Sequence, residues 1–449
     1  MELRTTAGSV PEAGTSISSG WPVSPRYAWV VFALSFGLLL SDYMSRQVLN
    51  AVFPMLKAEW LLSDAELGSL SGIVALMVGL LTFPLSLLAD RWGRVRSLLL
   101  AAMMWSLATL ACAVSATYGQ MFVGRLFVGI GEAAYGSVGI AVVLSIFPIG
   151  LRATLSGAFI AGGAFGSVLG VSLGGSVAQQ FGWRWAFGGM GVFGLVLAAV
   201  YGIVVTERRL APRAGSTDAR NEEAPRGRLR ELLPRLFSSV SVICAYAGSG
   251  LQLLIAAALM AWLPSYFNRY YGMPTAKAGA TAGVFVLIIG IGMVVGGIAS
   301  DRVSRALPVR KWTVAIICSV GSLVLLMAAF RLPAGSAQLL ALAAGALLSA
   351  GTAGPAAAMV ANLTPASISA TAFATLTLAN SLLGLAPGPA VTGRLADSMG
   401  LLGAMRIVPL AALAATAAFV TGRRHYARDL CRLTGPAPVT DRKETEIAR

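Results

Sequence analysis

Apolar residues run almost without interruption through twelve stretches of the chain, separated by short polar segments. Each stretch holds about 20 residues or more, the length that an α-helix needs to cross the hydrocarbon core of a bilayer. The pattern therefore predicts an all-α membrane protein with twelve transmembrane helices. The expected helices lie near residues 27–48, 67–90, 97–115, 120–147, 153–178, 184–205, 236–268, 279–300, 312–331, 336–362, 370–395 and 401–422.

The longest charged stretch divides the twelve expected helices into two sets of six. It is rich in Pro, Gly and charged residues, a composition typical of a linker. The start of the chain is polar and lacks the apolar segment of a signal peptide, so we expect a disordered leader there. The expected domains are a cytoplasmic leader 1–26, an N-terminal six-helix bundle 27–205, a cytoplasmic linker 206–235, a C-terminal six-helix bundle 236–422 and a basic cytoplasmic tail 423–449.

Composition and charge agree with a polytopic membrane protein. Of the 449 residues, 56% are hydrophobic and only 12% are charged, against roughly 25% charged residues in soluble domains. The net charge of +15 does not indicate nucleic-acid binding, because the basic residues cluster in loops between the apolar stretches. These clusters fall on one side of the membrane if there are twelve spans with both termini cytoplasmic. We expect a multi-pass protein of the plasma membrane, the inner membrane of a bacterium.

The chain offers little for metal or enzyme chemistry. Its four cysteines have no metal-ligand or CxxC spacing, and its single histidine, His425, lies near the basic C-terminal end. The apolar stretches contain no Ser/His/Asp set for nucleophilic catalysis. We therefore expect no metal, no cofactor and no enzymatic activity.

Two acidic residues lie inside apolar stretches, where they are costly. Asp42 lies in the first stretch and Glu132 in the fourth, and an ionised carboxylate near the middle of a bilayer costs about 2.5–3.5 kcal/mol. Each stretch also holds a cation: Arg46 follows Asp42 by one helical turn, and Arg125 precedes Glu132 by two. Buried charge of this kind indicates a transport pathway.

Two interpretations of these charges remain open. A carboxyl that alternates between a dry site and a site beside a guanidinium can bind and release a proton, which predicts proton coupling by Glu132 and Asp42. A permanent acid–arginine pair that only fixes helix packing is the alternative. Arg46 and Arg125 are candidates for the counter-ion of an acid or for a contact with an anionic head group.

A loop motif occurs once in each half of the chain. LADRWGRVR at the end of the second stretch is matched by ASDRVSR at the end of the eighth. Parallel repeats of this kind build the major facilitator transporters. The first copy resembles the loop motif of the major facilitator superfamily, and Arg125, Gly129 and Gly131 match a second motif of that family. The resemblance implies two pseudo-symmetric six-helix bundles and a gating role for Asp90, Arg91, Gly93, Arg94, Asp301 and Arg302.

Within that superfamily the chain resembles the spinster-like branch. The resemblance is carried by GRLFVGIGEAAYGSV, FGWRWAF and AWLPSYFNRYYGM. It implies proton-coupled transport of lysophospholipids and related lipids by alternating access. The first helix departs from the branch, because its acid stands at Asp42 rather than three residues later, where this chain has Ser45.

The expected cavity is charged on one wall and apolar on the other. Its charged groups belong to the N-terminal half, while the strongest polar groups of the C-terminal half are amides. Such a cavity suits an amphipathic solute, and the alternative is a small organic anion or a drug-like compound. The expected partners are membrane lipids, the solute and protons, and we expect a monomer. The predicted wall residues are Tyr43, Tyr135, Gln252, Trp262, Tyr266 and Asn380.

Overall fold

The first half of the chain forms six helices in a computed structural model that describes residues 21, 23–207, 239–305, 307–364 and 368–434. The expected leader, linker and tail lie largely outside these described residues. The helices of the first half follow one another with short connections. They are α1 (Pro25–Trp60), α2 (Asp64–Trp92), α3 (Arg94–Ala113), α4 (Tyr118–Ile146), α5 (Ile149–Phe181) and α6 (Trp183–Val204).

The second half is also helical, but two of its expected helices are interrupted. The tenth is divided at Gly351 and Thr352, and the eleventh contains a π-helical turn at Ser381–Leu385. The helices are α9 (Val240–Tyr271), α10 (Thr275–Ser304), α11 (Arg310–Ala329), α12 (Ser336–Ala350), α13 (Ala353–Asn362), α14 (Ser369–Asn380), α15 (Pro387–Ile407) and α16 (Ala411–Thr434).

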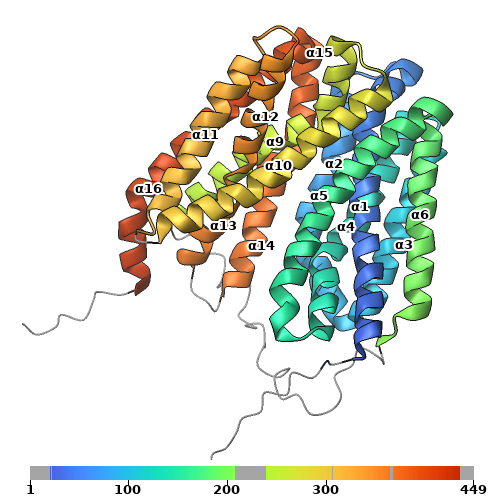
Figure 1. The fold of residues 1–449 in the computed structure, drawn as a ribbon, viewed down its shortest axis with the longest axis horizontal. Coiled ribbons are helices and arrows are strands. Elements are labelled where there is room, and N and C mark those ends of the chain that lie inside the picture. The colour runs from blue at the N-terminus through green and yellow to red at the C-terminus, as the bar shows by residue number, and fades with distance from the viewer. Residues whose placement is uncertain (1–20, 22, 208–238, 306, 365–367, 435–449) are drawn as a thin grey trace, which may run out of the picture.

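The two halves meet at one end of the molecule and diverge toward the other (Figure 1). We call these the closed end, where α2 begins and α15 ends, and the open end, where α1 begins and α16 ends. The main contacts between the halves are α2 with α15, α5 with α10 and α1 with α9, and smaller contacts join α2 with α14 and α1 with α10.

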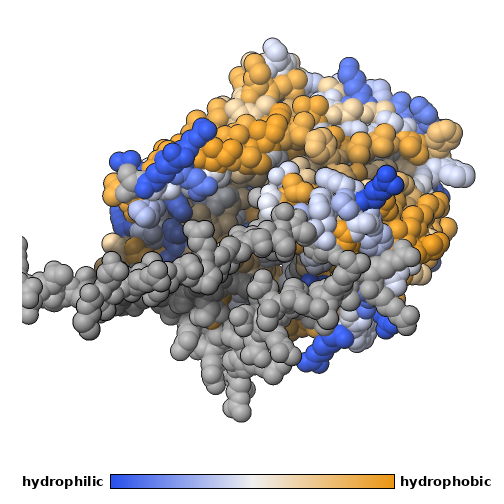
Figure 2. Space-filling model, turned by 60° about the horizontal axis from the view of Figure 1, so that its bottom comes forward, coloured by the Kyte–Doolittle hydropathy of each residue, from blue (hydrophilic) through white to orange (hydrophobic). Residues whose placement is uncertain are grey.

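Eleven helical stretches among the described residues are long and apolar enough to cross a membrane. The last, Thr371–Cys431, contains 61 residues, far more than the roughly 20 that one crossing needs. It is broken at Gly400, where φ is 75°, a conformation that glycine adopts without steric cost. Apolar side chains cover much of the flanks of both bundles (Figure 2). The prediction of an all-helical, polytopic membrane protein is confirmed.

Helix ends differ from the sequence prediction where polar side chains find partners. Helix α1 continues to Trp60 past Asn50, whose amide donates to Gln47 Oε1 at 2.6 Å. Helix α16 continues to Thr434, so part of the expected tail is helical. Its Asp429 accepts a hydrogen bond from the backbone N–H of Ser241 at 3.0 Å and so binds the start of α9.

Backbone contact without intervening side chains joins α2 to the segment around α15. A Cβ added to Gly72 would lie 2.5 Å from Ala386 O, and one added to Gly68 would lie 2.3 Å from Pro389 O. Small residues allow helix backbones to approach this closely in lipid. We call this contact the glycine seam.

Candidate functional site

The two predicted acids lie side by side in the middle of the first bundle. Asp42 is near the midpoint of α1, and Glu132 is the middle residue of α4. Both are buried, with exposed fractions of 5% and 3%. Their carboxyl groups are close enough to interact electrostatically. The structure therefore brings together two titratable groups that are far apart in the sequence.

Arg46 is the cation of this pair. Its Nε donates to Glu132 Oε2 at 2.9 Å, and its Nη2 donates to the same oxygen. The i,i+4 spacing on α1 pointed instead to a pair between Arg46 and Asp42. Because Glu132 projects from α4 toward α1, it takes both of these bonds, while the charge of Arg46 still acts on Asp42.

The guanidinium of Arg46 is thus the cation for two carboxyl groups, those of Glu132 and Asp42. Asp42 Oδ1 and Glu132 Oε1 are buried and have no hydrogen-bond partner in the described part of the chain. Two adjacent buried carboxylates repel each other, and one proton shared between them would remove that repulsion and supply a donor. The arrangement is chemically suited to binding a single proton.

Arg125 is placed differently from its predicted role as the counter-ion of Glu132. It is fully buried, and its guanidinium donates to three backbone carbonyls: Ser45 O at 2.9 Å, Arg46 O at 3.1 Å and Leu70 O at 3.3 Å. These contacts join α4 to α1 and α2. In this conformation Arg125 holds the helices that carry the acids, and it presents no exposed surface to a head group.

Replacing Arg125 with Met is therefore expected to lower the thermal stability of the protein. Hydrogen bonds from a charged donor contribute about 1.5–3 kcal/mol each, and the variant loses three of them. The measurement is thermal unfolding in detergent. A matched control is Arg184→Met, which removes a half-exposed pair with Glu59 that is expected to contribute about 1 kcal/mol or less. Equal melting temperatures for the two variants would refute the helix-joining role.

Arg46 and Tyr43 are the predicted site residues that retain exposed surface beside the acids. The side chain of Arg46 is 22% exposed, and its guanidinium carbon lies 5.6 Å from the centre of the Tyr43 ring. A guanidinium at this distance from an aromatic ring is held by a cation–π interaction. The pair therefore presents positive charge at the margin of the buried site.

Most of the other predicted wall residues are buried within the bundles. Tyr135, Gln252 and Trp262 have no exposed surface, and Tyr266 is 2% exposed. Their polar atoms are bound inside the protein: Tyr135 donates to Ser35 O, Gln252 donates to Ser319, Trp262 donates to Pro389 O, and Tyr266 accepts from Gln338. Tyr135, Gln252 and Trp262 therefore present no surface to a cavity in this conformation, whereas Tyr266 lines a pocket of about 420 Å³ at the closed end. The sequence could not show this, because it does not reveal which face of a helix is turned inward.

Asn380 is the exception in the second half. It is half-buried at the end of α14, and its Oδ1 has no hydrogen-bond partner among the described residues. It precedes the π-helical turn Ser381–Leu385 directly. An unpartnered amide oxygen at this point remains a candidate for contact with a solute.

The predicted gating motif is only partly described. The side chain of Asp90 lies outside the described part of the chain, and Arg91, Arg94, Asp301 and Arg302 are exposed at the open end. Gly93 has φ of 97° and begins the turn into α3. The carboxylate of Glu207 occupies the space beside Gly93, so that a Cβ there would lie 2.0 Å from Glu207 Oε1. The gating role of the motif stays a prediction.

A network of charges at the closed end joins the two halves, and sequence reasoning missed it. The carboxylate of Asp64 accepts from both terminal nitrogens of Arg269, at 2.7 and 2.8 Å, and from Lys57 at 2.6 Å. The carboxylate of Asp397 accepts from the backbone N–H groups of Asp64 and Ala65, at 2.7 and 2.9 Å. These are the first amides of α2, where a negative charge is favoured by the helix dipole. We call this network the closed-end latch.

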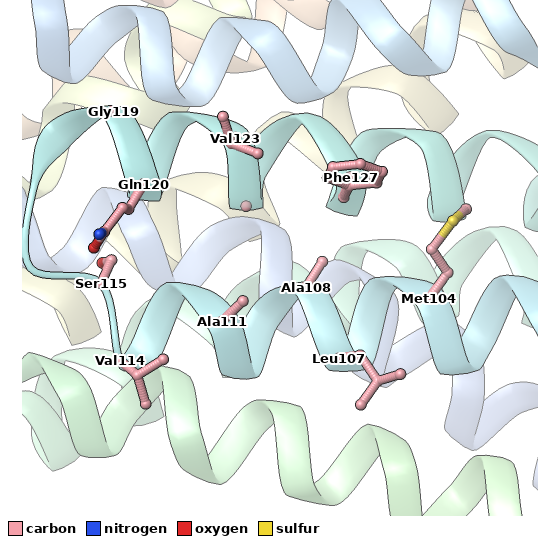
Figure 3. Close-up of a pocket in the computed structure, with 11 residues that line it drawn as sticks. Met104, Leu107, Ala108, Ala111, Val114, Ser115, Gly119, Gln120, Val123 and Phe127 are labelled. Carbon is pink, nitrogen blue, oxygen red and sulfur yellow. The ribbon is translucent and has the colours of Figure 1, made fainter.

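A groove of about 820 Å³ lies on the outside of the first bundle, between α3 and α4 (Figure 3). Its lining is mostly apolar, with Leu107 and Phe127 on opposite sides and Gln120 near one end. The groove is separate from the buried acids.

Comparison with known proteins places this geometry in context. The sequence model of a family described as the Major Facilitator Superfamily matches residues 35–389. A probable L-galactonate transporter of Escherichia coli (strain K12) is 25% identical over 306 residues, which cover 66% of this chain and 67% of that protein. Protein spinster homolog 3 of Danio rerio is 24% identical over 268 residues, covering 58% of this chain and 52% of that protein.

A solved structure shares the fold. It is the crystal structure of a bacterial homolog to the human lysosomal transporter Spinster, in an inward-facing and occupied conformation. The TM-score is 0.80 at 19% sequence identity, over 90% of this chain and 99% of the other.

Proposed function

The chain belongs to the major facilitator superfamily of transporters, and from that premise we propose that it is a proton-coupled secondary transporter of an amphipathic, lipid-like solute such as a lysophospholipid. The observation that carries the proton coupling is the buried arrangement of Asp42, Glu132 and Arg46, in which two carboxyl groups share one cation. Transport proceeds by alternating access between states that are closed at one end or the other.

We further propose twelve spans with both chain ends cytoplasmic in the plasma membrane. The break at Gly400 divides Thr371–Cys431 into two crossings. Arg91, Arg94 and Arg302 lie at the open end, which supports a cytoplasmic orientation of that end because basic residues favour the cytoplasmic side. In this orientation the described conformation is open to the cytoplasm.

The lipid-like solute is supported by apolar surface where the halves separate. Beyond the glycine seam, Gly79 faces the side chain of Ser381, where an added Cβ would lie 2.3 Å from Ser381 Cβ. Phe83 and Leu87 follow Gly79 on the same face of α2 toward the open end. Both are exposed, at 39% and 49%, and Phe373 of the second half is 40% exposed. An acyl tail can lie against such side chains while the head group reaches Arg46.

The test is binding across a lysophosphatidylcholine series of increasing tail length. Each additional buried CH₂ should contribute about 0.8 kcal/mol, so the dissociation constant should fall with tail length until the available apolar surface is covered. Binding is measured by displacement of a labelled lysophosphatidylcholine from the purified protein. The control is Arg46→Met, which should weaken binding of every member of the series by a similar factor.

The second candidate is a carrier of small organic anions. It is favoured by relatives whose names describe transporters of L-galactonate, 4-methylmuconolactone and hexuronate, and Arg46 could hold a carboxylate as well as a phosphate. Displacement by galactonate or a hexuronate, together with an affinity that does not depend on tail length, would favour this candidate over the lipid.

A further inference from the structure

A row of buried hydroxyl groups leads away from the two acids inside the first bundle. Tyr135 is three residues beyond Glu132 on α4 and therefore lies on nearly the same face. Its hydroxyl donates to Ser35 O on α1 and lies within electrostatic range of both Asp42 and Tyr201. Tyr135 thus connects the carboxyl pair to groups nearer the open end.

The row continues to the open end through α1 and α6. The hydroxyl of Tyr201 lies next to the side chain of Ser35 and within electrostatic range of Tyr27. Tyr27 is half-buried near the start of α1; its hydroxyl donates to Val204 O at 3.3 Å and accepts from Thr206 N at 3.5 Å. The row therefore ends at the surface where α6 ends.

Several polar atoms of the first bundle are buried and have no hydrogen-bond partner in the described part of the chain. They include the hydroxyls of Ser35, Ser41, Ser106 and Tyr201, besides the free carboxyl oxygens of Asp42 and Glu132. Buried polar groups without a protein partner commonly bind water, which needs two to four polar neighbours. The hydroxyls of Ser35 and Tyr201 lie next to each other and supply two such neighbours.

Gly194 keeps space open in this cluster. A Cβ at Gly194 would lie 2.3 Å from Ser106 Oγ and 2.7 Å from Ser41 Oγ. A glycine here leaves the two hydroxyls unobstructed, and Ser41 is adjacent to Asp42 in the sequence. The two hydroxyls therefore border space inside the first bundle, where α1, α3 and α6 meet.

We propose that the hydroxyls of Tyr135, Ser35, Tyr201 and Tyr27, with waters bound between them, carry protons between the Asp42–Glu132 pair and the open end. In each step an oxygen accepts a proton from one neighbour and releases its own proton to the next, so that one proton moves and every hydroxyl is restored. The inference rests on the proposed proton coupling. It adds that protons travel inside the first bundle, separately from the solute.

The charged groups around the carboxyl pair also favour proton movement toward the open end. Arg46 and Arg125 both act electrostatically on Glu132, from α1 and α4, and positive charge opposes the passage of a proton. Tyr135, a neutral hydroxyl within electrostatic range of Asp42, lies on the open-end side of the pair. The hydroxyl row leaves the pair through Tyr135, away from the two cations.

The experiment measures how fast the carboxyl pair takes up a proton after a pH jump, using the infrared C=O stretch of the purified full-length protein. Tyr201→Phe removes one hydroxyl and keeps the ring. It should leave the amplitude of the carboxyl signal unchanged and slow its appearance by about tenfold or more, since a positioned proton-transfer group contributes at least that much. Ser35→Ala, which keeps the carbonyl that Tyr135 binds, should have the same effect.

The matched control is Tyr246→Phe, which removes the hydroxyl of a buried tyrosine in the second bundle. In this variant the Asp42–Glu132 pair should take up its proton at the wild-type rate. Wild-type rates in both Tyr201→Phe and Ser35→Ala would overturn the relay and indicate that protons arrive through the space between the halves. The proposed function fails separately: it is contradicted if Glu132→Gln removes no carboxyl signal from the wild-type spectrum. Monodisperse elution and an unchanged melting temperature establish that each variant is folded.

Discussion

Glu132→Gln is expected to abolish proton-driven accumulation of solute while leaving the protein folded. The amide keeps the shape of the side chain and can still accept a hydrogen bond from Arg46, but it cannot bind or release a proton at physiological pH. Asp42 remains, but with Glu132 replaced there is no carboxyl pair to share a proton, so a pH gradient loses the group through which it biases the two conformations. The measurement is uptake of labelled lysophosphatidylcholine into proteoliposomes under an imposed pH gradient, where we expect a loss of about 10²-fold or more.

Exchange without a pH gradient provides the internal control. Counterflow of labelled against unlabelled solute needs alternating access but no net proton movement, so Glu132→Gln should retain it. Glu59→Gln changes a carboxyl at the closed end that is paired with Arg184, and it should keep both activities. Uphill accumulation by Glu132→Gln at the wild-type level would contradict proton coupling at this residue.

Breaking the closed-end latch is expected to shift the population toward states that are open at that end. Asp64→Ala removes the acceptor of Arg269 and Lys57. The carboxylate is 4% exposed, so its loss leaves two cations without a partner. A loss of about 1.4 kcal/mol already changes the ratio of the two states tenfold, and partly buried charge pairs between two bodies commonly contribute more than this.

Spin labels on the two halves would report the shift. Ala116 and Met399 are exposed positions near the closed end, one on each half. Electron–electron distance distributions between them should gain a longer component in Asp64→Ala and in Asp397→Ala. Glu59→Ala breaks a pair that lies within the first half and should leave the distribution unchanged. Identical distributions in all variants would show that the halves are held together by packing alone.

The central acids were predictable because their location is costly. An acid in the middle of an apolar stretch stands out in any sequence, whatever the neighbouring helices do, and Asp42 and Glu132 were found in this way. Their partners were harder to predict. The sequence predicts Arg46 as a cation beside the acids, but spacing along α1 could not reveal that its hydrogen bonds go to Glu132.

No feature of the sequence comparable to a buried acid pointed to the closed-end latch. Asp64, Arg269 and Asp397 lie near helix ends, where charged residues are ordinary, so nothing in their positions distinguished them. One signal was available for the local structure: Ser63 and Glu66 form a capping box, which would have placed the start of α2 at Asp64 instead of residue 67. Pairing between segments more than 200 residues apart depends on how the two halves assemble.

The glycine seam gives α2 a fixed point about which the helix can rotate. Gly72 bears directly on the backbone at Ala386, and the helix extends another 20 residues to Trp92, a lever of about 30 Å at 1.5 Å per residue. A rotation that barely displaces the backbones at this fixed point moves the far end of this lever by several times as much. A side chain at Gly72 would therefore push α2 away from the backbone at Ala386. It would disfavour the conformation in which the halves meet at the closed end, while leaving every titrating group in place.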